Sequence, residues 1–324
     1  MADRGELLYL CADDIAALGL TAQGVTDAVE AAFRDLGSGR AHSVPKVGFR
    51  ITAANFFHAM PARLDAAGVV GIKWIGTADN RTSGLPHINA MIVLSDFETA
   101  QVRAVMDGTA ITALRPAVIS LVAARRLARQ DARRIGFIAC GVQARAHLDA
   151  FCAQFPIREV TCHSASGASA LALAALARER GLTARVAAEA RDAVAAQDIV
   201  ISSPPRGSFA APFLDPRWLD PGAFVSGVDL GRSWRADRLR ELDLIVTDDR
   251  DQSRAEAAQP GVLPYQGDYD ADLAELASGR HPGRTAPSQR TFLLHPGLGL
   301  GDIAIAALVL ERAAAAGVGT RLPR

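Results

Sequence analysis

Two lysines are the first residues in the chain whose type suggests chemistry. The sequence contains 35 lysine and arginine residues, and only Lys46 and Lys73 are lysine, which leaves 35 − 2 = 33 arginines. A coding bias toward arginine replaces lysine wherever a surface charge is enough. An ammonium is compact and can release a proton, whereas a guanidinium stays charged in proteins. Lys46 and Lys73 are therefore candidates for substrate binding or proton transfer, and the alternative is that both remain on the surface by chance.

A second candidate site is the turn that closes the apolar stretch Ile135–Cys140. Ala139 and Gly141 lie in this turn, and Val142 and Gln143 begin a helical pattern directly after it. A dinucleotide site needs such a turn, because the pyrophosphate approaches the backbone closely and is held by the first N–H groups of the helix. The pattern reads A-x-G-x-x-A, so two of the three usual glycines are alanines. An ordinary turn of small residues fits the same pattern.

The residues about 20 positions after this turn bear on the choice of cofactor. An NAD-specific site usually carries an aspartate or glutamate there, which binds the ribose hydroxyls. The sequence has Ser164 and Ser166 instead. Without a carboxylate a 2′-phosphate is not repelled, and the serine hydroxyls can donate hydrogen bonds to it. The pattern therefore indicates NAD(P)(H) as the cofactor, with a slight preference for NADP(H).

Two further strand ends supply candidates at the same edge of the predicted sheet. Ser203 closes one apolar stretch, and Gly227 and Asp229 follow another. Open α/β sheets hold their ligands at the carboxyl ends of the strands. Ser203 and Gly227 are therefore candidate cofactor contacts, and Asp229 is a candidate general acid/base. The alternative for Asp229 is a carboxylate that caps a helix or a loop.

Arg115 is the remaining charged candidate, and it directly precedes Pro116 near the start of a predicted helix. A proline is tolerated in the first turn of a helix, where its missing N–H has no helical partner. A cation at this end opposes the helix dipole unless an anion lies with it. The carboxylate of a substrate would supply that anion in a bidentate pair. The alternative is a structural salt bridge.

The elements that position these residues follow two patterns. From residue 44 to 106 the polarity alternates with a period near two, which predicts a mostly antiparallel sheet. Its expected strands are 46–52, 55–63, 69–76, 88–95 and 102–106, and a polar loop, 77–87, contains His87. From residue 135 onward strands and helices alternate, which predicts a parallel, doubly wound sheet. Its expected strands are 135–140, 159–163, 183–187, 199–203, 223–228 and 244–247, with helices 143–155, 168–180 and 190–196.

Helices flank these two patterns. A strand is expected over 7–10, and Thr21 caps a helix in which Val25, Val29 and Phe33 share one face. A helix is also expected over 109–128. The last helix, 302–316, is strongly apolar and follows the alternating region, so it is expected to return to the first lobe.

Composition bounds the kind of protein. A length of 324 residues favours about two domains, since single cores stop growing at roughly 250–300 residues. A net charge of zero gives no bulk attraction to nucleic acid or to an anionic membrane. No apolar run approaches the length of a membrane span, and no basic segment followed by an apolar one opens the chain. We therefore expect a cytoplasmic protein with a small-molecule ligand.

The four cysteines have neither C-x-x-C spacing nor the density of a disulfide scaffold, and no metal site is expected from them.

Several linked motifs follow one another along nearly the whole chain. They are Met60-Pro61-Ala62, Gly71-Ile72-Lys73, Asn80 with Gly84-Leu85-Pro86, Met106-Asp107-Gly108, Thr112 to Arg115, Gly136 to Ala144, Gly227-Val228-Asp229 and Gly297 to Asp302. In their order and spacing these motifs resemble the ornithine cyclodeaminase/mu-crystallin family. The resemblance implies a substrate-binding and dimerisation domain of α+β type, formed by residues 1–118 and completed by 302–324. It also implies a Rossmann-type dinucleotide-binding domain over 119–301 and a homodimer.

The same resemblance implies roles for individual residues. Lys73 and Arg115 correspond to the pair that binds the substrate carboxylate and takes part in catalysis. Asp229 corresponds to the catalytic acid/base, and Val142 and Gln143 correspond to pyrophosphate contacts. Lys46, Met60 and His87 are further candidates for substrate binding. Ala139, Gly141, Val142, Gln143, Ser164, Ser203 and Gly227 are the candidate cofactor contacts. Lys46 stands where the family commonly has arginine, and Ser164 stands where it has the ribose aspartate.

Three functions fit these residues. The first is an NAD(P)-dependent reductase of imino acids, or a dehydrogenase of amino acids, that acts at the α-carbon of a small substrate. The second is a lyase of the cyclodeaminase type, in which the hydride leaves a diamino acid, ammonia departs and the hydride returns. The third is a non-catalytic binder of small molecules on the same fold.

Overall fold

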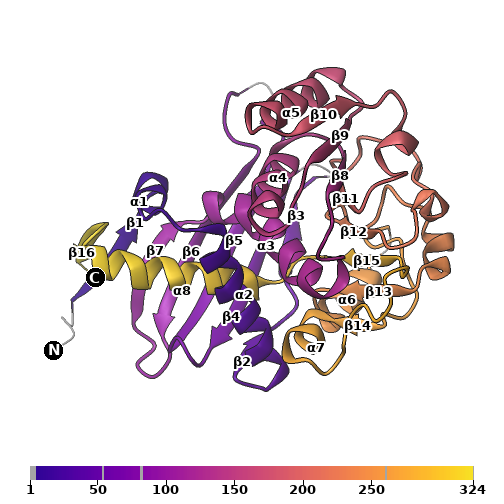
Figure 1. The fold of residues 1–324 in the computed structure, drawn as a ribbon. Helices are drawn as coiled ribbons and strands as arrows, with labels where there is room; N and C mark the ends of the chain where they lie inside the picture. The colour runs from indigo at the N-terminus through magenta and orange to yellow at the C-terminus, as the bar shows by residue number, and fades with distance from the viewer. Residues whose placement is uncertain (1–4, 53–54, 81–82, 260, 324) are drawn as a thin grey trace. The chain divides into compact units, whose positions relative to one another are not determined.

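The chain divides into two compact units in the structure, a computed structural model that describes residues 5–52, 55–80, 83–259 and 261–323. Unit 1 comprises Met1–Arg115 and Leu298–Arg324, and unit 2 comprises Pro116–Gly297. The boundaries expected from the sequence differ from these by 118 − 115 = 3 and 302 − 298 = 4 residues. Residues 81 and 82 of the predicted polar loop lie outside the described residues. Each unit contains its own sheet (Figure 1).

The sheet of unit 1 has the strand order β16-β1-β7-β6-β5-β4-β2, with β3 paired to β4. Neighbouring strands are antiparallel except β1 and β7, which are parallel. The alternation of polarity predicted this mostly antiparallel sheet. Its strands are β1 (Glu6–Leu10), β2 (Ala41–Ser43), β3 (Val47–Arg50), β4 (Phe56–Leu64), β5 (Val69–Thr77), β6 (Ile88–Asp96), β7 (Val102–Asp107) and β16 (Thr320–Pro323).

Helices cover one face of this sheet. The C-terminal helix α8 (Gly299–Ala316) packs on β4, β5 and β6 and against α2 (Ala22–Gly37). In Figure 1, α8 is yellow and α2 is indigo; the shorter α1 (Ala12–Ala17) lies near β1. Thr21 caps α2 as predicted, because its hydroxyl accepts a hydrogen bond of 3.1 Å from the Gly24 N–H. Because α8 packs on β4, β5 and β6, the apolar helix at the end of the chain returns to the first unit, as expected.

The alternation along β5 places successive side chains on opposite faces of the sheet. Val69 and Lys73 are buried on the helical face, whereas Val70, Ile72 and Trp74 are exposed on the other face. A lysine in the buried set is unusual, because charged side chains are almost never fully buried unless they are paired.

The sheet of unit 2 is parallel throughout, with the order β10-β9-β8-β11-β12-β15-β13-β14. The chain starts in the middle at β8, winds outward to β10, and then returns to β11 and winds the other way. The doubly wound parallel sheet predicted from the sequence is confirmed. Its strands are β8 (Arg134–Ile138), β9 (Glu159–His163), β10 (Thr183–Val186), β11 (Ile199–Ser202), β12 (Phe224–Gly227), β13 (Leu244–Thr247), β14 (Ala271–Asp272) and β15 (Thr291–Leu294).

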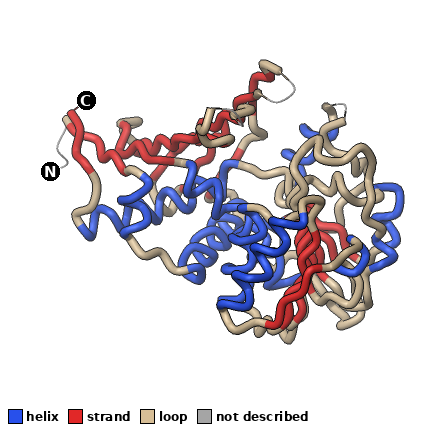
Figure 2. The backbone as a smooth tube through the Cα atoms, turned by 90° about the horizontal axis from the view of Figure 1, so that it is seen from above, coloured by secondary structure: helices blue, strands red, loops and turns tan. Residues whose placement is uncertain are grey.

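The helices of unit 2 are α4 (Val142–Gln154), α5 (Gly167–Glu179), α6 (Arg250–Ala257) and α7 (Leu273–Ser278), with 3-10 segments η1 (Ala190–Ala193), η2 (Pro216–Trp218) and η3 (Ala236–Glu241). Figure 2 shows these helices in blue and the parallel strands in red. The helix expected over 190–196 is wrong, because only η1 forms there. Ala196 adopts a positive φ of 57°, which is incompatible with a right-handed helix continuing through it.

Helix α3 (Thr109–Leu127) corrects the interpretation of Pro116. The helix starts at Thr109, where the Asp107 carboxylate accepts hydrogen bonds from the N–H groups of Thr109 and Ala110, at 2.8 and 3.2 Å. Pro116 is therefore the eighth residue of the helix and not part of its first turn. Arg115 lies in the second turn, so the reasoning that placed it at the positive end of the helix dipole was wrong.

Within the described residues, no helix combines the length and the hydropathy needed to cross a bilayer.

Candidate active site

Lys73 lies in the middle of β5 and is completely buried, with a side-chain exposure of 0%. Its Nζ donates a hydrogen bond of 2.7 Å to Oδ1 of Asp302, whose side chain is also 0% exposed. The two residues are 229 positions apart in the sequence. The pairing satisfies the requirement that a buried charge has a partner.

Arg115 adds a second cation to this pair. Its Nε lies 3.5 Å from Oδ2 of Asp302, and its side chain is 10% exposed. Within the described part of the chain, neither Arg115 Nε nor Asp302 Oδ2 has a hydrogen-bond partner. Lys73, Asp302 and Arg115 thus form a buried cluster, here called the Lys73 cluster, in which two positive charges face one negative charge. The surplus positive charge suits the carboxylate of a bound substrate, since arginine can bind a carboxylate bidentately.

The surroundings of Lys73 adjust its proton affinity. The pKa of Lys73 is lowered from 10.5 to about 8. Burial is the largest cause, the Asp302 carboxylate opposes it, and the positive charges of Arg115 and Lys46 lower the pKa further. A lysine with a pKa near 8 exchanges protons close to neutral pH. That is the property required of a group that relays a proton during turnover.

A close backbone approach holds α8 against the strands. Gly299 lies so near β4 that a Cβ at this position would meet the carbonyl oxygen of Met60 at 2.5 Å. Only glycine fits there, and the approach brings the first turn of α8, with Asp302, next to Lys73. Met60 is buried and pairs with Lys73 across β4 and β5. Lys46 is half-buried, and its charge acts on Lys73.

His87 does not share the surroundings of the Lys73 cluster. It is exposed in the polar loop, where its Nδ1 makes a hydrogen bond to the carbonyl oxygen of Ala78. No contact of His87 with Lys73, Arg115 or Asp302 is present among the described residues.

The dinucleotide turn of unit 2 has the geometry that its sequence indicated. Ala139 follows β8 with a φ of 67°, the left-handed conformation that glycine usually supplies at the first fingerprint position. An alanine there costs about 1 kcal/mol or slightly more. Gly141 is the N-cap of α4, which begins at Val142, and no side chain caps this helix. Helix starts of this kind bind anions through their first N–H groups.

The space around this turn also fits a pyrophosphate. A Cβ added to Gly141 would meet nothing within 4 Å, so the glycine leaves open space rather than a packed contact. The first turn of α4 contains no acidic residue. The turn lies where β8 and β11 are neighbours but the chain leaves them in opposite directions, which is the position where doubly wound sheets bind dinucleotides.

The other cofactor candidates lie at neighbouring strand ends. The N–H of Ser203 donates a hydrogen bond of 2.9 Å to Ile138 in β8, which holds Ser203 beside the turn. Ser164 follows β9 and accepts a hydrogen bond of 2.9 Å from Ser169. Gly227 closes β12, and Gly227 and Ser202 are paired across β12 and β11.

A cavity of about 490 Å³ adjoins the carboxyl end of β9 in unit 2. Its walls combine aromatic and charged side chains with one alanine. They are His163, Glu189, Ala190, Arg191, Asp192, Phe213 and Trp218. His163 directly precedes Ser164, so the cavity neighbours the serines from which the cofactor preference was inferred.

Asp229 lies two residues after β12 and is 3% exposed. Its Oδ2 accepts a hydrogen bond of 2.8 Å from the Ser233 N–H, and its Oδ1 accepts one of 3.2 Å from the Ser202 hydroxyl. Burial raises the pKa of Asp229, while the hydrogen bonds from Ser233 and Ser202 and the charge of Arg232 oppose this rise. Asp229 caps a loop, and its raised pKa also fits a candidate acid/base, so the choice between the two interpretations made from the sequence stays a prediction.

Asp302 and Ser202 contact the candidate residues Lys73 and Asp229, and the sequence reasoning missed both. A signal for Asp302 was present, because it is the only charged residue between Leu298 and Leu310, an otherwise apolar stretch of α8. An acid in such a stretch needs a buried cation as its partner. No comparable signal marked Ser202, which is one of many serines.

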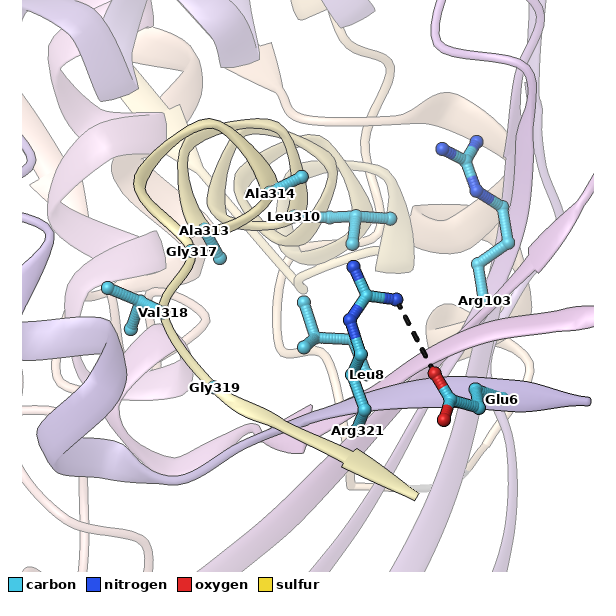
Figure 3. A pocket seen from close by; sticks show the side chains of 10 residues that line it. All are labelled: Glu6, Leu8, Arg103, Leu310, Ala313, Ala314, Gly317, Val318, Gly319 and Arg321. Atoms are coloured by element: carbon cyan, nitrogen blue, oxygen red, sulfur yellow. Dashed lines mark ion pairs between the residues drawn. The ribbon is translucent and has the colours of Figure 1, made fainter. Parts of the chain in front are cut away.

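A second cavity, of about 180 Å³, lies in unit 1 at the C-terminal end of α8, away from every residue predicted from the sequence. Figure 3 shows Arg321 and Glu6 facing each other on neighbouring strands beside it. Their ion pair of 3.8 Å is exposed, with side-chain exposures of 72% and 38%, and such pairs contribute little to binding or stability. Among the described residues, no group of His, Cys, Asp and Glu side chains is arranged to hold a metal ion.

The chain is similar to several known proteins over nearly its whole length. An alanine dehydrogenase from Archaeoglobus fulgidus is 30% identical over 330 residues, which cover 98% of this chain and 98% of that protein. An archaeal alanine dehydrogenase dimer with bound NAD has a TM-score of 0.83 at 28% identity, over 98% of this chain and 99% of the other. The Δ1-pyrroline-2-carboxylate reductase of Thermococcus litoralis, in complex with NADH and L-proline, has a TM-score of 0.85 at 28% identity, over 97% and 99%.

The match to a family extends from residue 8 to residue 317 and includes the Lys73 cluster, the dinucleotide turn and Asp229. The chain belongs to the ornithine cyclodeaminase/mu-crystallin family, as its motifs predicted.

Proposed function

We propose that the protein is a nicotinamide-dependent enzyme that acts on a C–N bond at the α-carbon of a small amino or imino acid. It reduces the imine of an α-keto acid, or oxidises the corresponding amino acid in reverse. The observation that carries the proposal is the buried Lys73 cluster, whose surplus positive charge and titratable ammonium match a substrate carboxylate and an imine nitrogen. The relatives named as alanine dehydrogenase and pyrroline-2-carboxylate reductase act on substrates of this class, which supports it.

The cofactor is assigned to unit 2. The N–H groups of Val142 and Gln143 at the start of α4 hold the pyrophosphate, and Gly141 leaves room for it. Ala139, Ser164, Ser203 and Gly227 lie at the strand ends that border the same edge of the sheet. When bound, the nicotinamide supplies or accepts the hydride.

The substrate is assigned to unit 1. Arg115 binds its carboxylate, and Lys46 adds positive charge nearby. Lys73 donates a proton to the reacting nitrogen, or accepts one from it, while Asp302 keeps the ammonium oriented. Asp229 is proposed as a second acid/base group, because its raised pKa brings it closer to the working pH.

The test is an assay of the reduced-nicotinamide absorbance with small α-keto acids plus ammonia or methylamine, and with cyclic imino acids. Consumption of the cofactor in proportion to product supports the reductase. Release of ammonia from a diamino acid without net change in absorbance identifies the cyclodeaminase-type lyase instead. Cofactor binding without turnover of any of these substrates indicates a non-catalytic binder and contradicts the proposal.

NADPH is expected to bind at least as tightly as NADH. No acidic residue follows Ser164 within the loop to α5, and the serine hydroxyls there can donate hydrogen bonds to a 2′-phosphate. The neighbouring cavity is lined by Arg191 and by two acids, Glu189 and Asp192, so its charges do not by themselves favour a phosphate. Titration of the protein fluorescence with each cofactor gives the two dissociation constants. A preference of tenfold or more for NADH contradicts the expectation and assigns the ribose to Glu189, which lines the same cavity.

A homodimer is expected from the uncovered face of the unit 1 sheet. Ile72 and Trp74 on β5 are 37% and 43% exposed, and Phe57 stacks on Trp74 with 5.5 Å between ring centroids. Contiguous apolar patches of this kind mark interaction sites, and the archaeal alanine dehydrogenase is a dimer. Light scattering at micromolar concentration is expected to give twice the mass of the chain, and Ile72→Glu is expected to give monomers.

Val186→Glu is the matched control, because Val186 is also 37% exposed but lies in unit 2. It is expected to leave the mass unchanged. A monomeric wild-type protein contradicts the expectation.

A further inference from the structure

A chain of buried hydrogen bonds runs through the carboxyl ends of β11 and β12 to Asp229. The indole Nε1 of Trp234 donates to Oγ of Ser202 over 2.9 Å, and Ser202 lies 3.2 Å from Oδ1 of Asp229. Trp234 and Ser202 are 0% exposed, and Asp229 is 3% exposed. This series of hydrogen bonds therefore lies out of contact with bulk water.

The chemistry of the donors decides which group donates and which accepts in each of these hydrogen bonds. An indole N–H can only donate, so Ser202 must accept from Trp234. The single proton of the Ser202 hydroxyl is then free to point to Asp229. The second oxygen of Asp229 faces the Ser233 N–H, which is also only a donor. Both carboxylate oxygens thus accept hydrogen bonds, which favour the ionised form of Asp229.

We propose that Ser202 and Trp234 are positioning residues that hold Asp229 as an oriented, ionised carboxylate for proton transfer. Trp234 fixes the rotation of the Ser202 hydroxyl. The oriented hydroxyl then holds the Asp229 carboxylate in one orientation through its hydrogen bond. The inference rests on the proposed acid/base role of Asp229, because positioning has a catalytic purpose only if Asp229 exchanges a proton during turnover.

Packing alone does not account for the arrangement. Trp234 meets Phe292 edge to face, with ring centroids 5.4 Å apart, and a phenylalanine could make this contact as well. A partner for a buried indole N–H could also be a backbone carbonyl. A purely structural role does not require Ser202 as this partner. It leaves unexplained why the remaining proton of Ser202 faces a buried carboxylate.

Among the described residues, the charge of Arg232 acts on Asp229, and Arg206 and Glu256 in turn act on Arg232. Burial raises the pKa of Asp229, and each hydrogen bond to the ionised form lowers this pKa again. Removing the donor from Ser202 is therefore expected to raise the pKa of Asp229 further.

Three variants of the full-length protein test the proposal: Ser202→Ala, Trp234→Phe, and the double variant. Difference infrared spectroscopy of the carboxyl band, referenced to Asp229→Asn, reports the pKa of Asp229 without reliance on activity. Ser202→Ala is expected to raise this pKa by about one pH unit, the size expected when a charged group loses a hydrogen bond. Trp234→Phe is expected to raise it by less, because the hydroxyl remains but loses its orientation.

Thermal unfolding separates positioning from packing. Ser202→Ala leaves the indole N–H without its partner and is expected to lower the melting temperature. The double variant removes both partners, so it is expected to regain part of the melting temperature while the pKa of Asp229 stays raised. A purely structural role predicts that stability and pKa recover together, which would overturn the proposal.

Two further variants serve as controls. Ser226→Ala removes another buried hydroxyl, from the neighbouring strand β12, which bonds Ser120 over 2.7 Å and not Asp229; it is expected to leave the pKa of Asp229 unchanged. Ser202→Thr keeps the hydroxyl and is expected to keep the wild-type pKa. If Trp234→Phe fails to fold, Ser202→Ala and Ser202→Thr decide the question.

The pH dependence of turnover distinguishes this inference from the proposed function. If the infrared pKa and the turnover profile both move in Ser202→Ala, both are supported. If the infrared pKa moves and the profile does not, Ser202 orients Asp229, but Asp229 is not the acid/base and the catalytic purpose of the positioning is refuted. If the infrared pKa does not move in a folded Ser202→Ala protein, the inference is wrong whatever the enzyme does.

Discussion

Replacing Lys73 by arginine is expected to lower turnover by about 10²–10⁴-fold, the loss typical of a positioned acid/base. The variant keeps the positive charge but loses the compact ammonium, and arginine does not release a proton in proteins. The guanidinium must also fit a site where Lys73 is fully buried against Asp302. The dissociation constant of the cofactor is expected to change by less than about threefold, because the cofactor is assigned to unit 2. Steady-state kinetics and cofactor titration measure the two quantities.

The pH profile gives this variant a second readout. Since the pKa of Lys73 is about 8, the ammonium is charged below that pH and neutral above it. Wild-type turnover is therefore expected to change with an apparent pKa near 8, and this limb is expected to be absent in Lys73→Arg. Circular dichroism and the melting temperature control for loss of the fold. Near-native activity in Lys73→Arg would mean that Lys73 supplies only charge, and the proton transfer would then fall to Asp229 or His87.

The local pattern of the sequence predicted most of the elements that carry the site. Alternating polarity is a property of neighbouring residues, so it located β5 and placed Lys73 on one defined face of it. The spacing of apolar residues located α2 and α8 in the same way. The turn at Ala139 was also recognisable, although alanine there gives a weaker signal than glycine.

Long-range contacts were beyond this kind of reasoning. Periodicity does not reveal that Asp302 meets Lys73, because the two residues are 229 positions apart and the contact depends on the path of α8. The insertion of β15 between β12 and β13 is likewise a matter of topology. At Pro116 the rule that a proline lies in the first turn of a helix gave a wrong position. The helix starts at the cap of Asp107 and continues through the proline. Tertiary packing overrides the helix-breaking tendency of a single residue.

Replacing Asp302 by alanine is expected to destabilise the protein by about 3–5 kcal/mol, the usual cost when a buried ion pair loses one partner. Asp302 is the shared anion of Lys73 and Arg115, with side-chain exposures of 0%, 0% and 10% for the three residues. Without it, two cations lie buried near each other and neither has its counter-charge. Urea denaturation at pH 7 measures the loss, and Glu311→Ala on the exposed side of α8 is the control, expected to stay within about 0.5 kcal/mol.

The pH dependence of this loss identifies its cause. The pKa of Lys73 is lower in the folded protein, about 8, than its ordinary value of 10.5, so the unfolded chain binds more protons between these two values. Stability from Lys73 therefore rises as pH increases from about 8 to 10.5, and its full penalty applies below 8. Because the Asp302 carboxylate raises the pKa of Lys73, removing it lowers this pKa further, and the window in Asp302→Ala begins below pH 8.

The deficit of Asp302→Ala is accordingly expected to shrink as pH rises and Lys73 becomes neutral. A double variant, Asp302→Ala with Lys73→Met, removes the stranded charge and is expected to recover part of the stability at pH 7, with Arg115 accounting for the rest. A deficit below about 1 kcal/mol at pH 7, or one that does not change with pH, would show that Asp302 does not balance Lys73. The carboxylate would then serve only to orient the ammonium.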